Sequence, residues 1–128
     1  MSVWLPSVQQ VLRLHEKLIA RTGGSDGVRS LPLIESALNR AAASFGGVDV
    51  WLDLEEKAAA VGCGLVQNHG FVDGNKRIGV AALLLILRKN GVNLAYTQEE
   101  LVRLGLDMAT NCIDVQEVAL WIKDHREE

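Results

Sequence analysis

The feature that most constrains the fold is an apolar run from Ile78 to Leu87 that carries no charged residue. At helical spacing the run is apolar on nearly every side, so other elements must surround it. It is well short of the about 20 apolar residues that a bilayer-spanning helix needs. The run therefore predicts a buried helix from about Asn75 to Asn90, which Gly91 can follow in a left-handed conformation.

Helical spacing extends over most of the remaining chain, where apolar residues recur at intervals of three and four. The expected helices are Ser7 to Arg21, Leu31 to about Ala43, about Asp53 to Asn68, about Asn75 to Asn90, Thr97 to Thr110 and Asp114 to His125. Capping boxes are expected at Ser7 with Gln10 and Thr97 with Glu100, and a weaker cap at Asp114 with Glu117. Strand-like patterning is confined to Val92 to Tyr96 and Val48 to Leu52, and the short segment Phe45 to Leu52 could be extended. The sequence thus predicts an all-α fold of about six helices in one domain, residues 1–128, with a short flap near Phe45 to Leu52.

Several single residues also have a predicted place. The helix expected at about Asp53 to Asn68 is rich in small residues, which lets another helix approach closely, while its start around Glu55 is expected to be exposed. His15 falls on an apolar helix face and is predicted to be a satisfied core group, whereas His125 is predicted to be solvated. Cys63 lies in a helical pattern and predicts a buried free thiol.

Composition limits the classes of function. Apolar residues make up 48% of the chain and charged residues 23%, which is typical of a globular protein. The net charge of −3 gives no general attraction to nucleic acid or to an anionic membrane. The N-terminus lacks a basic and apolar secretory pattern, and the two cysteines fit no metal spacing, so we expect a cytoplasmic protein.

The motif His69-Gly70-Phe71-Val72-Asp73-Gly74-Asn75-Lys76-Arg77 stands directly before the apolar run. His69 is the only imidazole near it, and the ordinary histidine pKa of about 6.5 allows proton transfer from a hydroxyl at neutral pH. Asp73 supplies a hard oxygen ligand suited to a Mg²⁺ ion that bridges phosphate oxygens. Together these residues suit phosphoryl or nucleotidyl transfer.

The second half of the motif could bind an anion. Gly74 can adopt a positive φ, and backbone N–H groups around Gly74, Asn75 and Lys76 would then form a nest at the helix start. Lys76 adds a point charge, and Arg77 can bind phosphate oxygens or anchor the loop. Two cations in a first helical turn oppose the helix dipole, which favours an anion between them.

Structural explanations of the same residues stay open on spacing alone. Asp73-Gly74 is a common turn dipeptide, and a lone histidine near a helix end is usually a cap or a core hydrogen bonder. Lys76-Arg77 by itself would be a solvated face. A phosphate site and a structural loop therefore remain two hypotheses.

The pattern His-x-Phe-x-Asp-Gly-Asn-Lys-Arg resembles the signature of the Fic/Doc family, and its Doc branch in particular. The likeness covers about Val8 to Asp124. Other segments that look like those of the Doc branch are Gly23-Gly24, Gly27-Val28-Arg29, Leu33 to Leu38, Glu56 to Ala59 and Leu87 to Gly91. A motif of this length with matching flanks is highly specific.

The resemblance implies a compact all-helical Fic fold, with the signature loop between two central helices. His69 would be the base that deprotonates the target hydroxyl, and Asp73 would hold Mg²⁺. The phosphates of ATP would be cradled by Gly74, Asn75, Lys76 and Arg77. A flap at Phe45 to Leu52 would align the target peptide by backbone pairing.

Two positions bear on which group is transferred. Many Fic proteins transfer AMP and carry a glycine and a second arginine where this chain has Lys76 and Val80. Doc proteins share the lysine and pass the γ-phosphate of ATP to a threonine of elongation factor Tu, which arrests translation. We therefore expect a Doc-type toxin that phosphorylates a translation factor. AMP transfer to a protein hydroxyl is the alternative, and a catalytically weakened antitoxin-binding or regulatory module is a second.

The resemblance also implies a separate inhibitor. Doc proteins are held inactive by a Phd-type antitoxin, whose C-terminal segment folds into a groove beside the site. The self-inhibitory motif of some other Fic proteins, Ser/Thr-x-x-x-Glu-Gly/Asn, is absent from the sequence. We therefore expect a Phd-type antitoxin and an exposed apolar groove, without direct contact to nucleic acid or membrane. Gly70 and Gln67 depart from the family, which often carries proline and a basic residue at these positions.

Overall fold

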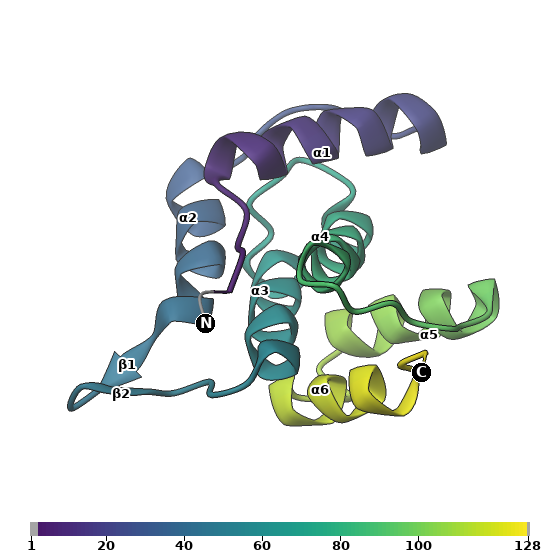
Figure 1. Ribbon diagram of the computed structural model, residues 1–128. Helices are drawn as coiled ribbons and strands as arrows, with labels where there is room; N and C mark the ends of the chain where they lie inside the picture. The colour runs from purple at the N-terminus through teal and green to yellow at the C-terminus, as the bar shows by residue number, and fades with distance from the viewer. Residues whose placement is uncertain (1–2, 128) are drawn as a thin grey trace.

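Residues 3–127, the part of the chain that the computed structural model describes, form six α-helices, one short 3₁₀ helix and a two-stranded hairpin (Figure 1). In chain order these are α1 (Val8–Thr22), α2 (Leu31–Asn39), the 3₁₀ helix η1 (Arg40–Ala42), β1 (Ser44–Phe45), β2 (Val48–Asp49), α3 (Leu54–Asn68), α4 (Asn75–Lys89), α5 (Gln98–Ala109) and α6 (Val115–Asp124). The predicted all-α class is confirmed. No helix among these residues has the length and apolarity needed to cross a membrane.

Helix α3 lies at the centre of the fold, with α2, α4, α5 and α6 packed around it (Figure 1). Every residue from Ala58 to Val66 is buried. A Cβ atom added to Gly62 would lie 3.1 Å from the carbonyl oxygen of Gly79 in α4, and one added to Gly79 would overlap Val66. The predicted close approach of a second helix is therefore confirmed, and it depends on glycine in both helices.

Helix α4 is buried against its neighbours but is not covered on every side. Ile78, Leu83 and Ile86 are fully buried, whereas Leu84 and Leu85 are half-buried. Helix α1 crosses α4 and α5 packs against it, and these two helices leave part of its outer face open (Figure 1). The expectation of burial on nearly every side was thus too strong.

Capping boxes start four of the six helices in the described residues. The two predicted boxes, Ser7 with Gln10 and Thr97 with Glu100, are present, and so is the weaker candidate at Asp114 with Glu117. A fourth box, Asp53 with Glu56 at the start of α3, was not predicted. Ser30 caps α2 through its hydroxyl, which accepts from the backbone N–H of Leu33.

The predicted flap is a β-hairpin that extends away from the helices (Figure 1). Gly46 and Gly47 form its tip with φ values of 60° and 81°, which suit the tight turns of two-residue hairpins. Phe45 at its end is 86% exposed. The preceding helix was expected to reach Ala43, but α2 ends at Asn39 and only a 3₁₀ turn follows, because the chain must leave the helix to form the hairpin.

The C-terminal part of the fold corrects three expectations. Val92 to Tyr96 is not a strand, since it forms only one isolated bridge, between Leu94 and Arg126. Glu55 is buried rather than exposed, because its carboxylate pairs with Arg126 at 2.9 Å. His125 is not solvated, because its ring stacks on Trp121 and binds the Glu100 carboxylate.

Cys63 is a buried free cysteine, as predicted. Burial raises the pKa of its thiol to about 11. The thiol therefore stays protonated and behaves as a small apolar group.

Candidate active site

The motif loop begins at His69, which directly follows α3. His69 adopts a left-handed conformation (φ 50°, ψ 47°), which costs a residue other than glycine about 1–3 kcal/mol. Arg29 holds it there, since its Nε donates to the carbonyl oxygen of His69 at 2.7 Å and its Nη2 to that of Asn68 at 3.3 Å. Within residues 3–127 nothing hydrogen-bonds to the His69 ring, which is exposed. Arg29 therefore caps α3 and leaves the imidazole open to a substrate.

The middle of the loop is tied to the segment before α2. Backbone N–H groups of Arg29 and Ser30 donate to the carbonyl oxygen of Gly70 at 2.8 and 2.9 Å, and the N–H of Val72 donates to Gly27 at 3.1 Å. Phe71 lies between these bonds and is buried. The loop is therefore a packed part of the fold.

Asn75 closes the loop onto itself. Its side-chain oxygen accepts from the backbone N–H of Phe71, and its side-chain nitrogen donates to the carbonyl oxygen of Phe71, both at 3.1 Å. These two bonds hold the amide side chain against the loop backbone and use one of its two N–H donors.

The N-terminus of α4 differs from the starts of the other α-helices in the described residues, because no side chain caps it. Gly74 precedes it with φ 77°, the left-handed conformation expected from the sequence. The backbone N–H groups of Asn75, Lys76 and Arg77 have no hydrogen-bond partner among residues 3–127. Three free N–H groups at the positive end of a helix dipole are an arrangement that can accept an anion.

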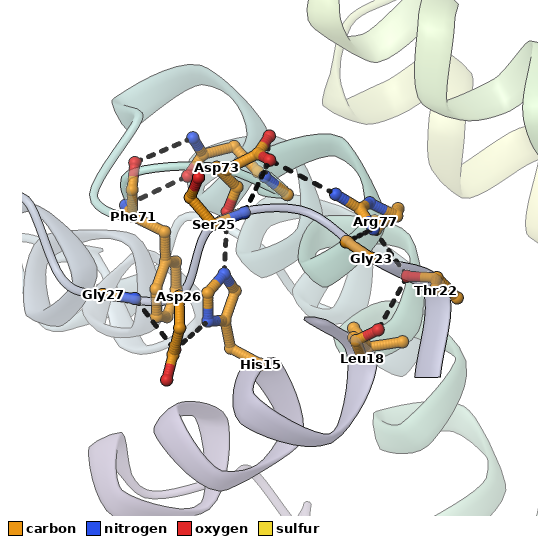
Figure 2. A network of polar contacts seen from close by, with 12 residues as sticks. His15, Leu18, Thr22, Gly23, Ser25, Asp26, Gly27, Phe71, Asp73 and Arg77 are labelled. Carbon is orange, nitrogen blue, oxygen red and sulfur yellow. Dashed lines mark hydrogen bonds and ion pairs between the residues drawn. The ribbon is translucent and has the colours of Figure 1, made fainter. Parts of the chain in front are cut away.

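The carboxylate of Asp73 faces this helix start and is held by two backbone groups (Figure 2). Its Oδ2 accepts from the N–H of Ser25 at 3.1 Å, and its Oδ1 from that of Gly74 at 2.8 Å. These bonds, with a smaller effect of Arg77, hold the pKa of Asp73 below its usual range. The carboxylate is half-exposed and stays ionised at neutral pH.

Asp73 fits the chemistry of a Mg²⁺ ligand. The ion is commonly held by one or two carboxylates together with substrate phosphates and water. In the described part of the chain no group of three or more acidic, histidine or cysteine side chains could enclose a metal by itself. Asp73 would therefore be one protein ligand of an ion shared with phosphate oxygens.

The two cations of the motif are placed differently. Arg77 donates from Nη1 to the hydroxyl of Thr22 and, at 2.7 Å, to the carbonyl oxygen of Gly23 (Figure 2). It thus anchors the loop after α1, one of the two roles that the sequence left open. Lys76 is exposed and has no ion-pair partner within residues 3–127.

Gln67, at the end of α3, donates to the side chain of Asn111 at 2.9 Å.

Sequence reasoning missed the contribution of the loop after α1. A Cβ on Gly24 would lie 2.6 Å from Oδ2 of Asp73, so only glycine lets Ser25 reach that carboxylate. Two adjacent glycines are a visible signal of a loop, but the bond from Ser25 to Asp73 spans 48 positions of sequence and has no local pattern.

Comparison with known proteins identifies the family. A family model described as the Fic/DOC family matches residues 4–87. The chain is 38% identical over 99 residues to a protein named Toxin Doc from Mycolicibacterium smegmatis, and the match covers 76% of each chain. It is 33% identical over 113 residues to Protein kinase doc of Escherichia phage P1, with 88% of each chain covered. The chain therefore belongs to the Fic/DOC family, within its Doc branch.

Proposed function

We propose that this chain is a Doc-type toxin that transfers the γ-phosphate of ATP to a serine or threonine hydroxyl of a translation factor resembling elongation factor Tu, and so arrests translation. The observation that carries the proposal is the uncapped start of α4, with three free N–H groups beside the ionised carboxylate of Asp73. A polyphosphate complements both features, because its oxygens accept hydrogen bonds and its accompanying cation needs a carboxylate.

His69 is suited to act as the general base. Its ring is exposed and has no competing partner in the described residues. In the transfer, the target hydroxyl gives its proton to the imidazole as its oxygen bonds to the γ-phosphorus. The bond from the γ-phosphorus to the bridging β–γ oxygen breaks, and ADP leaves.

The remaining motif residues would bind and orient the donor. Backbone N–H groups of Asn75, Lys76 and Arg77 would cradle phosphate oxygens, and the Lys76 ammonium would add a mobile positive charge. Asp73 would hold Mg²⁺, which when bound neutralises charge on the phosphates. The hairpin of β1 and β2, with its exposed backbone edges, would align a target peptide by strand addition.

Transfer of the γ-phosphate is favoured over transfer of AMP by two observations. Lys76 places a bulky cation at the position where many Fic proteins that transfer AMP have glycine. The relative from phage P1 is named a protein kinase. A Phd-type antitoxin that blocks the site is the proposed partner, since Doc proteins resembling this chain have one.

The test uses ATP labelled at the γ or the α position, with purified elongation factor Tu as substrate. We expect label transfer from the γ position only. His69→Asn should lower the rate by about 100-fold or more, the usual contribution of a general base. Asparagine tolerates the left-handed conformation of residue 69, so this variant should melt at least as high as the wild type. Transfer of the α label alone would replace the proposal with AMP transfer. Growth arrest that persists unchanged in His69→Asn would refute an enzymatic toxin.

A further inference from the structure

His15 lies in the middle of α1, outside the motif, yet its side chain reaches the motif loop (Figure 2). It is 1% exposed, and it and Glu55 are the two buried polar or charged residues of the described chain. A buried imidazole needs partners for its polar atoms, so the identity of those partners indicates what it does.

The partner of the ring is the backbone of the proposed metal ligand. Nε2 of His15 lies 2.7 Å from the carbonyl oxygen of Asp73. A carbonyl oxygen can only accept, so Nε2 carries the proton and donates it. Nδ1 lies 3.8 Å from Oδ1 of Asp26, and the ring stacks on Phe71 with a centroid distance of 3.8 Å and an angle of 14°.

Asp73 is held at both its side chain and its backbone. Ser25 and Gly74 fix its carboxylate through backbone N–H groups, while His15 fixes its carbonyl oxygen. Gly74 follows directly and leads into the free N–H groups of α4. Rotation of the peptide after Asp73 would therefore displace both the carboxylate and the anion-binding N–H groups.

We propose that His15 is a positioning residue for phosphate transfer: its Nε2–H locks the peptide of Asp73, so that the metal-binding carboxylate and the first turn of α4 keep one geometry. The kinetic consequence rests on the proposed function. The structural consequence, an ordered Asp73 peptide, does not.

A pair of substitutions separates this role from simple core packing. The side-chain nitrogen of glutamine is as many bonds from Cβ as Nε2 of histidine, whereas that of asparagine corresponds to Nδ1. His15→Gln can therefore keep the donor to Asp73, and His15→Asn cannot. Both remove the aromatic ring, so loss of stacking on Phe71 is common to the two variants.

Nuclear magnetic resonance of the full chain tests the structural consequence without any turnover. In the wild type the His15 ring should be the tautomer with the proton on Nε2. His15→Asn should shift the amide signals of Ser25 and Gly74, which bind the Asp73 carboxylate, and speed their hydrogen exchange. His15→Gln should keep both near their wild-type values. A wild-type Nε2 without a proton, or unchanged signals in His15→Asn, would overturn the proposal. If His15→Asn does not fold, the proposal is tested by the tautomer of His15 in the wild type and by the amide signals of His15→Gln.

Kinetics tests the second consequence. His15→Asn should lower kcat by about 100-fold, as expected when a reacting group is displaced by about 1 Å, and His15→Gln by no more than about threefold. The KM for the protein target should stay within about twofold in both, because the hairpin of β1 and β2 lies away from α1 (Figure 1). Equal losses in the two variants would show a packing role only. A wild type without phosphate transfer would refute the proposed function and leave the resonance result to decide on His15.

Discussion

Gly70 is buried where residues 27–30 cross the motif loop, and a side chain has no space there. A Cβ would lie 2.5 Å from Cγ1 of Ile34 and 3.2 Å from the carbonyl oxygen of Ser30. We expect Gly70→Ala to lower the free energy of unfolding by about 2 kcal/mol, since overpacking costs about 1–3 kcal/mol. Urea unfolding measures the change. Val72→Ala, at an exposed neighbour, is the control and should stay within about 0.5 kcal/mol of wild type. Equal stability of the two variants would contradict the argument.

The sequence pointed to the side chains of the candidate site more readily than to the residues that hold them. His69, Asp73 and Lys76 could be singled out because their side-chain types and spacing are local facts. The closure of the loop by Asn75 and the bond from His15 to Asp73 depend on packing between segments far apart in the chain. His15 was predicted as a satisfied core group, which is confirmed, but no pattern named its partner.

Among the elements, the hairpin of β1 and β2 carries apolar surface that the fold does not use. Phe45 is 86% exposed, so Phe45→Ser should leave the melting temperature unchanged. If the hairpin binds the target, the same change should raise the KM for that protein by about tenfold, because an aromatic contact of about 1.4 kcal/mol is lost. Steady-state kinetics with elongation factor Tu checks this. Leu120→Ser, on the exposed face of α6, is the matched control and should alter neither value. An unchanged KM in Phe45→Ser would remove this residue from target binding.

Glu100 in α5 and His125 at the end of α6 form an ion pair whose strength depends on pH. Both ring nitrogens of His125 face acceptors, Nδ1 the carbonyl oxygen of Trp121 and Nε2 the Glu100 carboxylate, each at 2.7 Å. Burial opposes the charged ring, but the hydrogen bonds to Glu100 and Trp121 outweigh it and raise the pKa of His125. The bond from His125, followed by that from Thr97, lowers the pKa of Glu100.

The sign of the effect follows from these two shifts. The contribution of His125 is complete below the unfolded pKa of about 6.5 and is lost as the pH rises through its raised folded value. That of Glu100 is present above about pH 4.3 and is lost as the pH falls through its lowered value. We expect the melting temperature to fall between about pH 6 and pH 9, and Glu100→Gln to reduce that fall. Glu99→Gln removes the same charge from the same helix turn and should keep the wild-type dependence. Identical profiles for the two variants would contradict the pairing.

Element prediction worked where the signal is local. Helical spacing and capping boxes gave six helices within a few residues of their ends. It failed where the conformation of a segment depends on residues far away in the sequence. Val92 to Tyr96 has strand-like composition, but its neighbour is the C-terminal tail, with which it forms one isolated bridge and two flanking backbone bonds rather than a ladder. The early end of α2 likewise reflects the hairpin that follows it.

For the molecule as a whole, α3 links the motif loop at one end to the C-terminal tail at the other. His69 follows its last residue, while Glu55 in its first turn pairs with Arg126. Backbone bonds fasten the tail nearby, since Ala95 donates to His125 at 2.7 Å and Glu127 to Asn93 at 2.9 Å. The tail therefore helps fix the helix on which the site is built.

Removing Arg126 tests how far the tail supports α3. Arg126→Ala would leave the Glu55 carboxylate, whose side chain is 8% exposed, without its cation. A fully buried pair loses about 3–5 kcal/mol when one partner is removed, but Arg126 is half-exposed and the N-terminus of α3 also stabilises the carboxylate. We therefore expect a loss of about 2 kcal/mol in the free energy of unfolding, measured in urea.

Two further variants make that loss interpretable. Glu55→Gln combined with Arg126→Ala should recover most of it, because the amide needs no counter-charge. Lys123→Ala breaks the more exposed pair between Lys123 and Asp53, whose atoms are 3.0 Å apart. It should lower the free energy of unfolding far less than Arg126→Ala does, since solvent screens that pair. If Arg126→Ala and Lys123→Ala prove equally mild, the pair with the buried carboxylate does not fasten the tail to α3. The backbone bonds from Ala95 to His125 and from Glu127 to Asn93 would then fix the tail without it.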